Sequence, residues 1–269
     1  MKQILKPLVK YQGGKSRELP LIKQLLPSKF ERVVEPFCGG AAVSFALGHS
    51  ALLSDINRDV INLYSVVADK NTYPNLQNKI NLIKTLDHDD LEKEYYSARE
   101  AINQSWDCVD NYQRALAYII VRQLCFSGME RYNAKGEFNV PFGHYKKFSC
   151  NLSPAHHQYL KNHCEFKNNS FVDIFSEIRD DDFIFIDPPY LDRLGYTEGD
   201  GGNTLHQNLF ECLKNTKAKW MIVHSDHEFY RECYKDYNIQ TNKFCYAQIF
   251  GKNKDHSGAK VDHLYIRNY

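Results

Sequence analysis

The sequence contains no apolar run of the length that a membrane-spanning helix needs, which is about 20 residues. Its longest uninterrupted apolar stretch is Ala115–Val121. The first residues also lack the apolar segment that a signal peptide carries. We therefore expect no membrane partner, and a cytoplasmic location.

Two families of short motifs are missing as well. The eight cysteines never stand within three residues of one another, so Cys-x-x-Cys metal and redox motifs do not occur. We expect free thiols in a reducing compartment and no metal. Neither Gly-x-Gly-x-x-Gly nor a P-loop pattern is present, which disfavours a nicotinamide dehydrogenase and a P-loop nucleotidase.

An excess of charge of one sign is also lacking. Lys and Arg total 34, Asp and Glu total 33, and the formal net charge is +1. This balance excludes a histone-like polycation. Positive charge is instead local, because residues 1–32 hold eight Lys/Arg against two Asp/Glu, and residues 122–150 hold five against two. Both segments could contact phosphates.

The remaining composition is that of an ordinary globular protein, with 269 residues of which 43% are hydrophobic. Residues 32–35 and 51–54 are predicted strands. A glycine turn and a helix over 41–47 separate them, and a second helix follows from about 58 to 67. This order is typical of a βαβ unit in a parallel sheet. Further strands are predicted at 183–186, 220–223 and 262–267.

The middle of the chain has a different pattern. Apolar residues from Leu91 to Ile102 fall on one helical face, and residues 115–126 are apolar nearly all round, as in a buried helix. A glycine-punctuated loop is expected over 127–151. We therefore predict a discontinuous α/β domain formed by residues 1–65 and 165–269, interrupted by a mostly helical insertion over 66–164.

The strongest local signal is Asp187-Pro188-Pro189-Tyr190, directly after the apolar strand 183–186. Parallel sheets bind ligands at the carboxyl ends of their strands. An acid, a proline carbonyl and an aromatic face are suited to accept hydrogen bonds from, and stack on, an amino-bearing base that has left its helix. A proline-rich turn that only ends a strand is the structural alternative.

Two further segments have the residue types of a cofactor site. Glycines in Glu35–Gly40 stand between a strand and a helix, and Asp55 ends the next strand, where an acid commonly holds ribose hydroxyls. Tyr11–Lys15 places two glycines before a lysine, which suits an anionic ligand group. A purely structural glycine turn and an N-terminal cap at Asp55 are the alternatives.

The segment Arg131–Lys147 interleaves basic and aromatic residues across glycine turns. Phosphate contact and the reading of guanine by arginine are the functions that such residues perform in nucleic-acid binders. A solvated surface loop is the alternative, and this segment alone does not distinguish it from nucleic-acid contact.

Together and in this order, the motifs resemble the D12 class of adenine-specific DNA methyltransferases, close to the Dam family. The resemblance extends from Leu8 to Asn268. The segments that carry it are Leu8–Lys15, Val34–Gly40, Ser54–Asn57, Gly128–Gly143 and Asp187–Tyr190.

The resemblance implies S-adenosylmethionine as cofactor and N6 of a flipped adenine in double-stranded DNA as methyl acceptor, usually within GATC. It also implies a Rossmann-like methyltransferase fold with an inserted helical recognition domain, and a monomer in the cytoplasm of a bacterium or of a phage-infected host cell. The residues that match the family's positions by sequence are, as catalytic residues, Asp187, Pro188 and Tyr190; as cofactor contacts, Tyr11, Lys15, Glu35, Phe37, Gly39, Asp55 and Asp187; and as DNA contacts, Lys10, Met129, Arg131, Asn133 and Pro141.

Three rival functions remain beside this one. They are an RNA adenine methyltransferase with the same catalytic motif, a cytosine-N4 methyltransferase, which usually has serine where Asp187 stands, and an inactive DNA-binding protein. Ser127–Glu130 departs from the Asn-Gly-Leu that commonly precedes the recognition arginine, so the target sequence is open. Repair marking, restriction protection and phage self-protection are equally compatible with the sequence.

Overall fold

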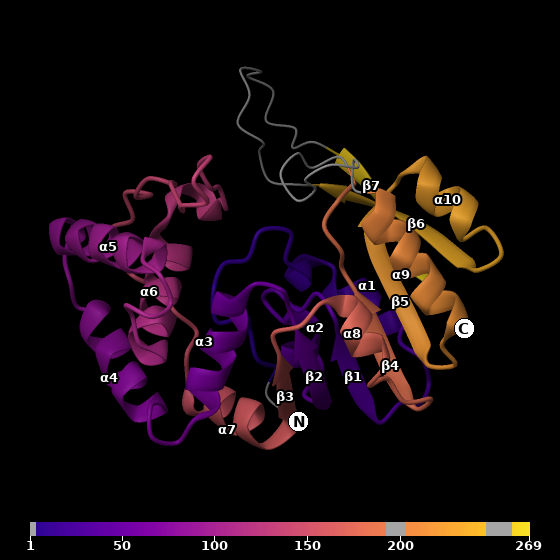
Figure 1. The fold of residues 1–269 in the computed structure, drawn as a ribbon, viewed down its shortest axis with the longest axis horizontal. Coiled ribbons are helices and arrows are strands. Elements are labelled where there is room, and N and C mark those ends of the chain that lie inside the picture. Colours follow the sequence, from indigo (N-terminus) through magenta and orange to yellow (C-terminus); the bar gives the residue numbers. More distant parts are fainter. Residues whose placement is uncertain (1–3, 192–202, 246–259) are drawn as a thin grey trace. The chain divides into compact units, whose positions relative to one another are not determined.

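The structure is a computed structural model that describes residues 4–191, 203–245 and 260–269. The chain forms two compact units, each discontinuous in sequence (Figure 1). Unit 1 comprises Met1–Leu26 and Cys38–Asn169, and unit 2 comprises Pro27–Phe37 and Ser170–Tyr269. The division into a catalytic domain and a recognition domain at residues 66 and 164 stays a prediction.

Unit 1 is mostly helical. Its elements are η1 (Lys15–Arg17), α1 (Leu19–Gln24), α2 (Ala42–Leu47), β2 (Ser50–Ser54), α3 (Arg58–Ala68), α4 (Tyr73–Ile83), α5 (His88–Asn103), α6 (Asn111–Leu124), η2 (Phe126–Gly128), α7 (Pro154–His163) and β3 (Cys164–Lys167). The strands β2 and β3 pair in parallel.

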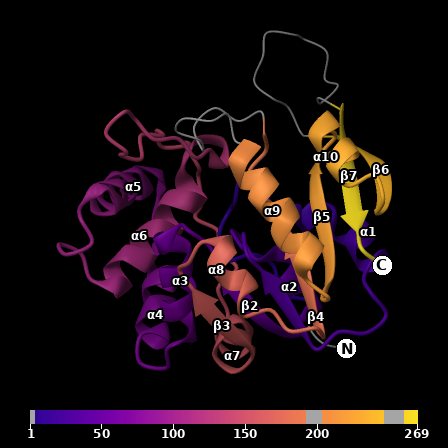
Figure 2. The same cartoon turned by 45° about the vertical axis from the view of Figure 1, so that its right-hand side comes forward.

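Helices α5 and α6 lie side by side, and α3 packs on α6 and on α7 (Figures 1 and 2). The apolar face of α5 is the one that the spacing predicts, because Leu91, Tyr95, Ala98 and Ile102 are all buried. Helix α6 is buried nearly all round over its last two turns, also as predicted. It begins earlier than its apolar run, because the Asp110 side chain accepts a hydrogen bond from the Gln113 N–H and so caps the helix start.

Unit 2 is built on strands. Its elements are β1 (Arg32–Glu35), α8 (Phe171–Phe175), β4 (Asp182–Ile186), α9 (Asn203–Asn215), β5 (Lys219–Ser225), α10 (Glu228–Cys233), β6 (Asn238–Cys245) and β7 (Lys260–Arg267). Within this unit the strand order is β1-β4-β5-β7-β6.

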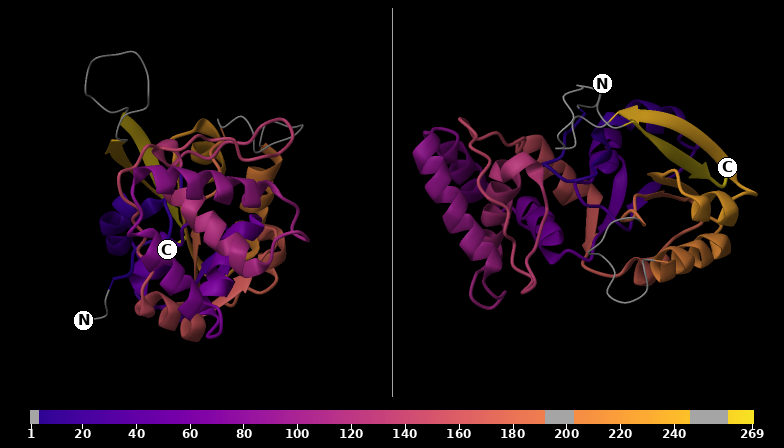
Figure 3. Two further views of the ribbon diagram at one scale, coloured as in Figure 1. Left: turned by 90° about the vertical axis from the view of Figure 1, so that its left-hand side faces the viewer. Right: turned by 90° about the horizontal axis from the view of Figure 1, so that it is seen from above.

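The sheet of unit 2 is mixed. Strands β1, β4 and β5 are parallel, whereas β7 runs antiparallel to both β5 and β6. All five residues of β4 are buried, which fits the prediction of a central parallel strand. Helix α9 lies against β5 (Figure 2), and α9 and α10 lie next to one another beside the strands (Figure 3).

A buried ion pair ties β1 to β4. Arg32 and Asp182 are register partners, and the guanidinium donates two hydrogen bonds to the carboxylate, at 2.9 Å from Nε and 2.8 Å from Nη2. Asp182 also accepts a hydrogen bond from the backbone N–H of Arg179 at 2.8 Å. Such bidentate geometry is what a buried pair needs in order to offset the cost of removing two charges from water.

Candidate functional site

The glycine loop of unit 1 wraps around the end of β2. The Gly39 N–H donates to Oδ2 of Asp55 at 2.8 Å, and the Cys38 N–H donates to the carbonyl of Ser54 at 2.8 Å. Gly39 has φ of +43° and lies against the ring of Tyr11, so that an added Cβ would come within 2.5 Å of Cε1 of that ring. The loop therefore requires glycine at position 39 for both conformation and space.

Asp55 is the buried acid of this loop. Its Oδ1 accepts a hydrogen bond from the Asn57 N–H at 2.9 Å, in addition to the bond from Gly39. Burial nevertheless raises the pKa of Asp55 to about 6, because removal from water outweighs the two N–H donors that favour the charged form. The next residue, Ile56, is 79% exposed, so the acid stands beside an uncovered apolar side chain.

Three other predicted cofactor contacts lie in two different surroundings. In unit 1, Lys15 is buried, and its Nζ donates to the carbonyl of Gly13 at 2.9 Å. In unit 2, Glu35 is a buried residue at the carboxyl end of β1. Phe37 packs against the ring of Phe171, with 5.2 Å between ring centroids.

The predicted catalytic motif begins one residue beyond β4, at the carboxyl end of a strand with parallel neighbours on both sides. Pro188 is buried, and Asp187 and Tyr190 are half-buried. Tyr190 meets the ring of His224 edge-on at 5.0 Å, and its hydroxyl lies 3.5 Å from Nε2 of His263. The aromatic side chain of the motif is thus surrounded by residues of β5 and β7.

The segment after α6 forms a short two-stranded arm. Tyr132 and Phe138 are paired as in an antiparallel bridge, and the Asn139 N–H donates to the carbonyl of Arg131 at 3.1 Å. The turn at the arm's tip is built by Asn133, whose Oδ1 accepts hydrogen bonds from the N–H groups of residues 135 and 137. Asn133, a predicted DNA contact, therefore also shapes the arm.

Helix α5 holds the base of this arm. The hydroxyl of Tyr95 donates to the carbonyl of Val140 at 2.7 Å. The amide of Asn103 accepts from the N–H of Phe138 at 2.7 Å and donates to its carbonyl at 3.0 Å. These contacts satisfy backbone groups of Phe138 and Val140 in the arm.

Arg131 is fixed in place by another residue of the arm. Its Nε donates to Oδ1 of Asn139 at 2.7 Å, and its Nη2 donates to the carbonyl of the same residue at 3.1 Å. Neither of these described bonds uses Nη1. The guanidinium is exposed and held by two bonds to one residue, and its planar fork of donors suits a bidentate contact to a planar acceptor. Met129 and Pro141 are exposed on the same arm.

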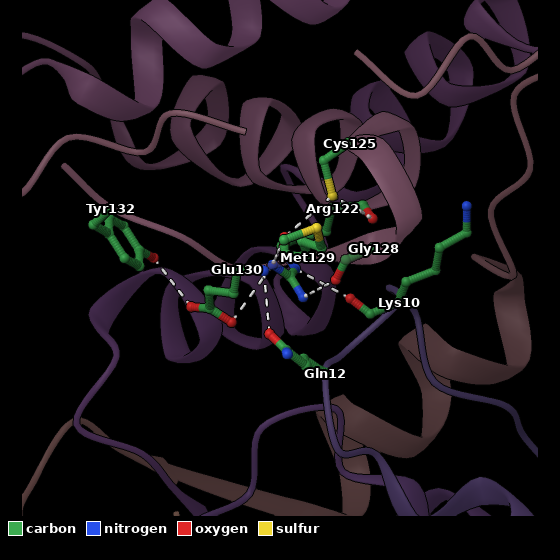
Figure 4. A network of polar contacts seen from close by, with 8 residues as sticks. All are labelled: Lys10, Gln12, Arg122, Cys125, Gly128, Met129, Glu130 and Tyr132. Carbon is green, nitrogen blue, oxygen red and sulfur yellow. Dashed lines mark hydrogen bonds and ion pairs between the residues drawn. The ribbon is translucent and has the colours of Figure 1, made fainter. Parts of the chain in front are cut away.

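Arg122 joins the arm to the segment before η1 (Figure 4). The side chain is 1% exposed, and it donates to the carbonyls of Lys10, Gly128 and Met129 at 3.1–3.3 Å. Its Nη1 lies 3.5 Å from the Glu130 carboxylate. A single buried guanidinium thus satisfies backbone carbonyls of two segments far apart in the sequence.

The remaining contacts of this network involve Glu130 and Lys10. The N–H of Glu130 donates to the Gln12 side chain at 3.2 Å, and Tyr132 donates to the Glu130 carboxylate at 3.1 Å (Figure 4). Lys10 extends along α6, where its Nζ donates to the carbonyl of Gln123 at 2.7 Å and lies 3.8 Å from the centre of the Tyr145 ring. Two predicted DNA contacts, Lys10 and Met129, are therefore neighbours in unit 1.

Residues 11–248 match the family model of the D12 class N6 adenine-specific DNA methyltransferases. The chain belongs to this family. It is 34% identical to the type II methyltransferase M.CviBI of Paramecium bursaria Chlorella virus NC1A, over 98% of this chain and all of that one. It is also 34% identical to the DNA adenine methylase of Escherichia coli K12, over 68% of this chain and 64% of the other.

A third relative is the DNA N-6-adenine-methyltransferase of Escherichia phage P1, which is 32% identical over 85% of this chain and 31% of its own length. The α/β fold and the adenine-methyltransferase activity predicted from the motifs are thus confirmed. Within the described residues of this D12 methyltransferase, no helix is long and apolar enough to cross a bilayer. No group of three or more His, Cys, Asp or Glu residues in those same ranges could hold a metal ion.

Sequence reasoning missed several residues of this D12 methyltransferase that support its site. They are Arg122, Asn139 and Asn103 of unit 1, and His224 and His263 of unit 2. Arg122 and Asn103 lie at the ends of predicted helices, where a polar side chain gives no signal of its partner. The sequence of Leu191–Asn203 is rich in glycine and charge and predicts a mobile loop that orders on DNA, but residues 192–202 lie outside the described residues.

Proposed function

We propose that this chain transfers a methyl group from S-adenosylmethionine to N6 of an adenine flipped out of duplex DNA, within the sequence GATC. The observation that carries the proposal is the position of Asp187–Tyr190 at the carboxyl end of β4, in a chain that belongs to the adenine-specific family. We further propose a monomer that works in the cytoplasm of a bacterium or of a phage-infected cell.

The chemical problem is the weak nucleophilicity of the adenine amino group, whose lone pair is delocalised into the ring. We propose that the Asp187 carboxylate and the Pro188 carbonyl accept the two N–H bonds of N6. Two acceptors on one nitrogen favour a tetrahedral geometry and stabilise the positive charge that develops there during attack. Tyr190 stacks on the base, a contact worth about 1–3 kcal/mol in single-strand binders.

The residues present fit the proposed cofactor. Asp55 is a buried acid with both oxygens on backbone N–H groups, and exposed Ile56 follows it, which suits a ribose beside an apolar base. S-adenosylmethionine supplies an electrophilic methyl group on a sulfonium. The residues that we propose to hold it are Tyr11, Lys15, Glu35, Phe37, Gly39, Asp55 and Asp187.

The arm of unit 1 supplies the proposed reading of DNA. Arg131 is held by Asn139 in an orientation suited to the O6 and N7 acceptors of guanine. Lys10, Met129, Asn133 and Pro141 complete the proposed contacts with duplex DNA. The local excess of basic residues over 1–32 and 122–150 supports contact with phosphates despite the balanced total charge.

The experiment that tests this function is methylation of unmethylated duplex DNA, followed by single-molecule mapping of N6-methyladenine. We expect the modified base in GATC and no transfer to cytosine. Modification of RNA in preference to the matched duplex would favour the RNA methyltransferase instead. Adenine methylation outside GATC would leave the activity in place and refute the assigned target sequence.

A further inference from the structure

The end of α6 holds the segment that precedes η1. The carbonyl of Leu8 accepts a hydrogen bond from Nε2 of Gln123 at 3.0 Å, and the carbonyl of Lys10 accepts one from Nε of Arg122 at 3.1 Å. In return, Nζ of Lys10 donates to the carbonyl of Gln123 at 2.7 Å. Residues 8 and 10 are therefore tied to one end of a helix that lies 112–115 residues further along the chain.

The same helix end holds the start of the arm. Nη2 of Arg122 donates to the carbonyl of Gly128 at 3.3 Å, and Nη1 donates to that of Met129 at 3.2 Å. These two carbonyls belong to the peptide groups on either side of Met129. The Cys125 thiol adds a weaker bond to the Met129 carbonyl, at 3.4 Å. One guanidinium thus fixes backbone groups of Lys10 and of Met129, which are two of the proposed DNA contacts (Figure 4).

The charge of Arg122 is balanced within the same network. Its side chain is 1% exposed, and its Nη1 lies 3.5 Å from the carboxylate of Glu130, whose side chain is 9% exposed. A buried guanidinium needs such a partner, and a cation is also favoured at the C-terminal end of a helix. Because so little of Arg122 is exposed, it can act on DNA only through the residues that it holds.

The turn that enters the arm needs this support. Ser127 has φ of +54° and Gly128 has φ of +66°, so two successive residues adopt the left-handed conformation. Serine is strained in this conformation, whereas glycine is not. Such strain persists where surrounding contacts hold the chain, and the bonds from Arg122 to residues 128 and 129 come directly after the strained serine. Loss of these bonds should let the turn relax and displace Met129.

We propose that Arg122 is a positioning residue for base reading, which sets the places of Lys10 and Met129 together. This role rests on the function proposed above. Arg131 has a separate support, because both bonds described for its side chain go to Asn139. Base contacts depend on hydrogen-bond and van der Waals distances that a small shift of the backbone changes. The two supports should therefore govern different parts of target discrimination.

Arg122→Lys tests this role. Lysine keeps the positive charge beside Glu130 but replaces a planar fork of donors by one ammonium group, which cannot hold three carbonyls in the same geometry. The measurement is kcat/KM for methyl transfer on duplexes that carry the site found by the mapping above, with one base pair substituted at a time. We expect Arg122→Lys to lower the discrimination against substituted duplexes by about 3- to 10-fold, and to change the cofactor Kd by less than about threefold.

A cycle of combined variants identifies the residues through which Arg122 acts. In a chain that already carries Lys10→Ala and Met129→Ala, Arg122→Lys should cause little further loss of discrimination, because the side chains that it positions are gone. In a chain that carries Arg131→Ala, it should add its full effect. Full effects in both backgrounds would overturn the proposal. A uniform loss on all duplexes with Lys10→Ala and Met129→Ala would also overturn it, because neither residue would then read bases.

Helix α6 offers a matched control. Arg114 is 5% exposed, donates to the carbonyls of Ile102 and Gln104 at 3.0 and 2.9 Å, and pairs with Asp59 at 2.7 Å. Arg114→Lys should lower the melting temperature about as much as Arg122→Lys does, and leave the discrimination unchanged. An equal loss of discrimination in the two variants would reduce Arg122 to a purely structural residue and overturn the proposal.

A milder variant replaces Arg122→Lys if that variant does not fold. Glu130→Gln keeps the size of the side chain and the backbone bond to Gln12 but removes the charge beside Arg122, and the same outcomes then decide. Absence of methyl transfer by the unaltered chain would refute the proposed function. An active chain whose variant keeps the discrimination of the unaltered chain would refute this inference alone.

Discussion

At the scale of single residues, burial moves the pKa of a side chain in the candidate site away from its ordinary value. Asp55 is the clearest case, because two N–H donors favour its charged form and burial still raises its pKa to about 6. A ligand that brings hydroxyl donors would favour the carboxylate form. Ribose hydroxyls should therefore stabilise the charged form of Asp55 more than they would stabilise that of an exposed acid.

A pH dependence follows from this raised pKa. Because free Asp55 is protonated below about pH 6, S-adenosylmethionine affinity should fall as the pH drops through 6, by up to about tenfold per unit. Titration calorimetry from about pH 5 to about pH 8, a range that brackets this pKa, measures the affinity. Asp55→Asn should bind weakly with no such dependence. A pH profile shared by the variant and the unaltered chain would assign the effect to another group.

The raised pKa of Asp55 also affects the stability of the fold, and this effect has the opposite pH dependence to that of cofactor binding. Between about pH 4 and pH 6 the folded chain holds the Asp55 proton and the unfolded chain does not, so the free energy of unfolding should fall as the pH rises through this window. The loss is about 3 kcal/mol when complete. Urea denaturation at several pH values, compared with Asp55→Asn, isolates this contribution.

The proposed recognition of the target base pair depends on Arg131 and on Asn139, which holds it. Arg131→Ala should cost about 1–3 kcal/mol at a single base pair and relax specificity there. Asn139→Ala leaves the arginine in place but removes its Oδ1 partner, and we expect a smaller loss at the same base pair. Methylation rates on a set of singly substituted duplexes measure both. An equal loss on every duplex would indicate phosphate contact instead.

At the scale of elements, the described structure holds irregular segments in place by side-chain hydrogen bonds to their backbone. Helix α5 serves the recognition arm in this way through Tyr95 and Asn103, and Arg122 of α6 does so for residues 10, 128 and 129. In the sheet of unit 2, the corresponding fixed point is the Arg32–Asp182 pair between β1 and β4. In these three places a charged or polar side chain fixes the position of a segment.

The Arg32–Asp182 pair carries a prediction for stability. Arg32→Met leaves the fully buried Asp182 carboxylate without its partner, which should cost about 3–5 kcal/mol. The double variant Arg32→Met, Asp182→Leu should recover much of this. Lys93→Met removes a mostly exposed partner of Asp90 and should leave the urea midpoint nearly unchanged. The urea midpoints of these variants measure the effect. Similar losses of stability in Arg32→Met and Lys93→Met would contradict the account.

At the scale of the whole molecule, much of the fold follows from the sequence. The apolar run 183–186 and the spacing from Leu91 to Ile102 predicted β4 and the buried face of α5, because burial and periodicity are local properties. The βαβ unit and the strand 183–186 were predicted as parallel, whereas the last strand was predicted without a direction, and as β7 it runs antiparallel to both of its neighbours. No local pattern reports the direction of a strand that returns from a distant part of the chain.

The candidate site was predictable in the same uneven way. Asp55 and Asp187 follow apolar strands, so their positions at strand ends could be read from the chain. The buried place of Arg122 could not, because it depends on partners far away in sequence. The predicted target GATC and the predicted domain limits remain predictions.

The most direct test of the central claim is a paired measurement on Asp187→Ala, with methyl transfer to duplex DNA and S-adenosylmethionine binding followed on the same preparation. Asp181→Ala, an exposed acid just before β4, is the matched control and should behave as the unaltered chain. We predict that Asp187→Ala abolishes transfer while retaining at least part of its cofactor affinity. Full turnover by Asp187→Ala would contradict the assignment of this carboxylate to the chemistry at N6.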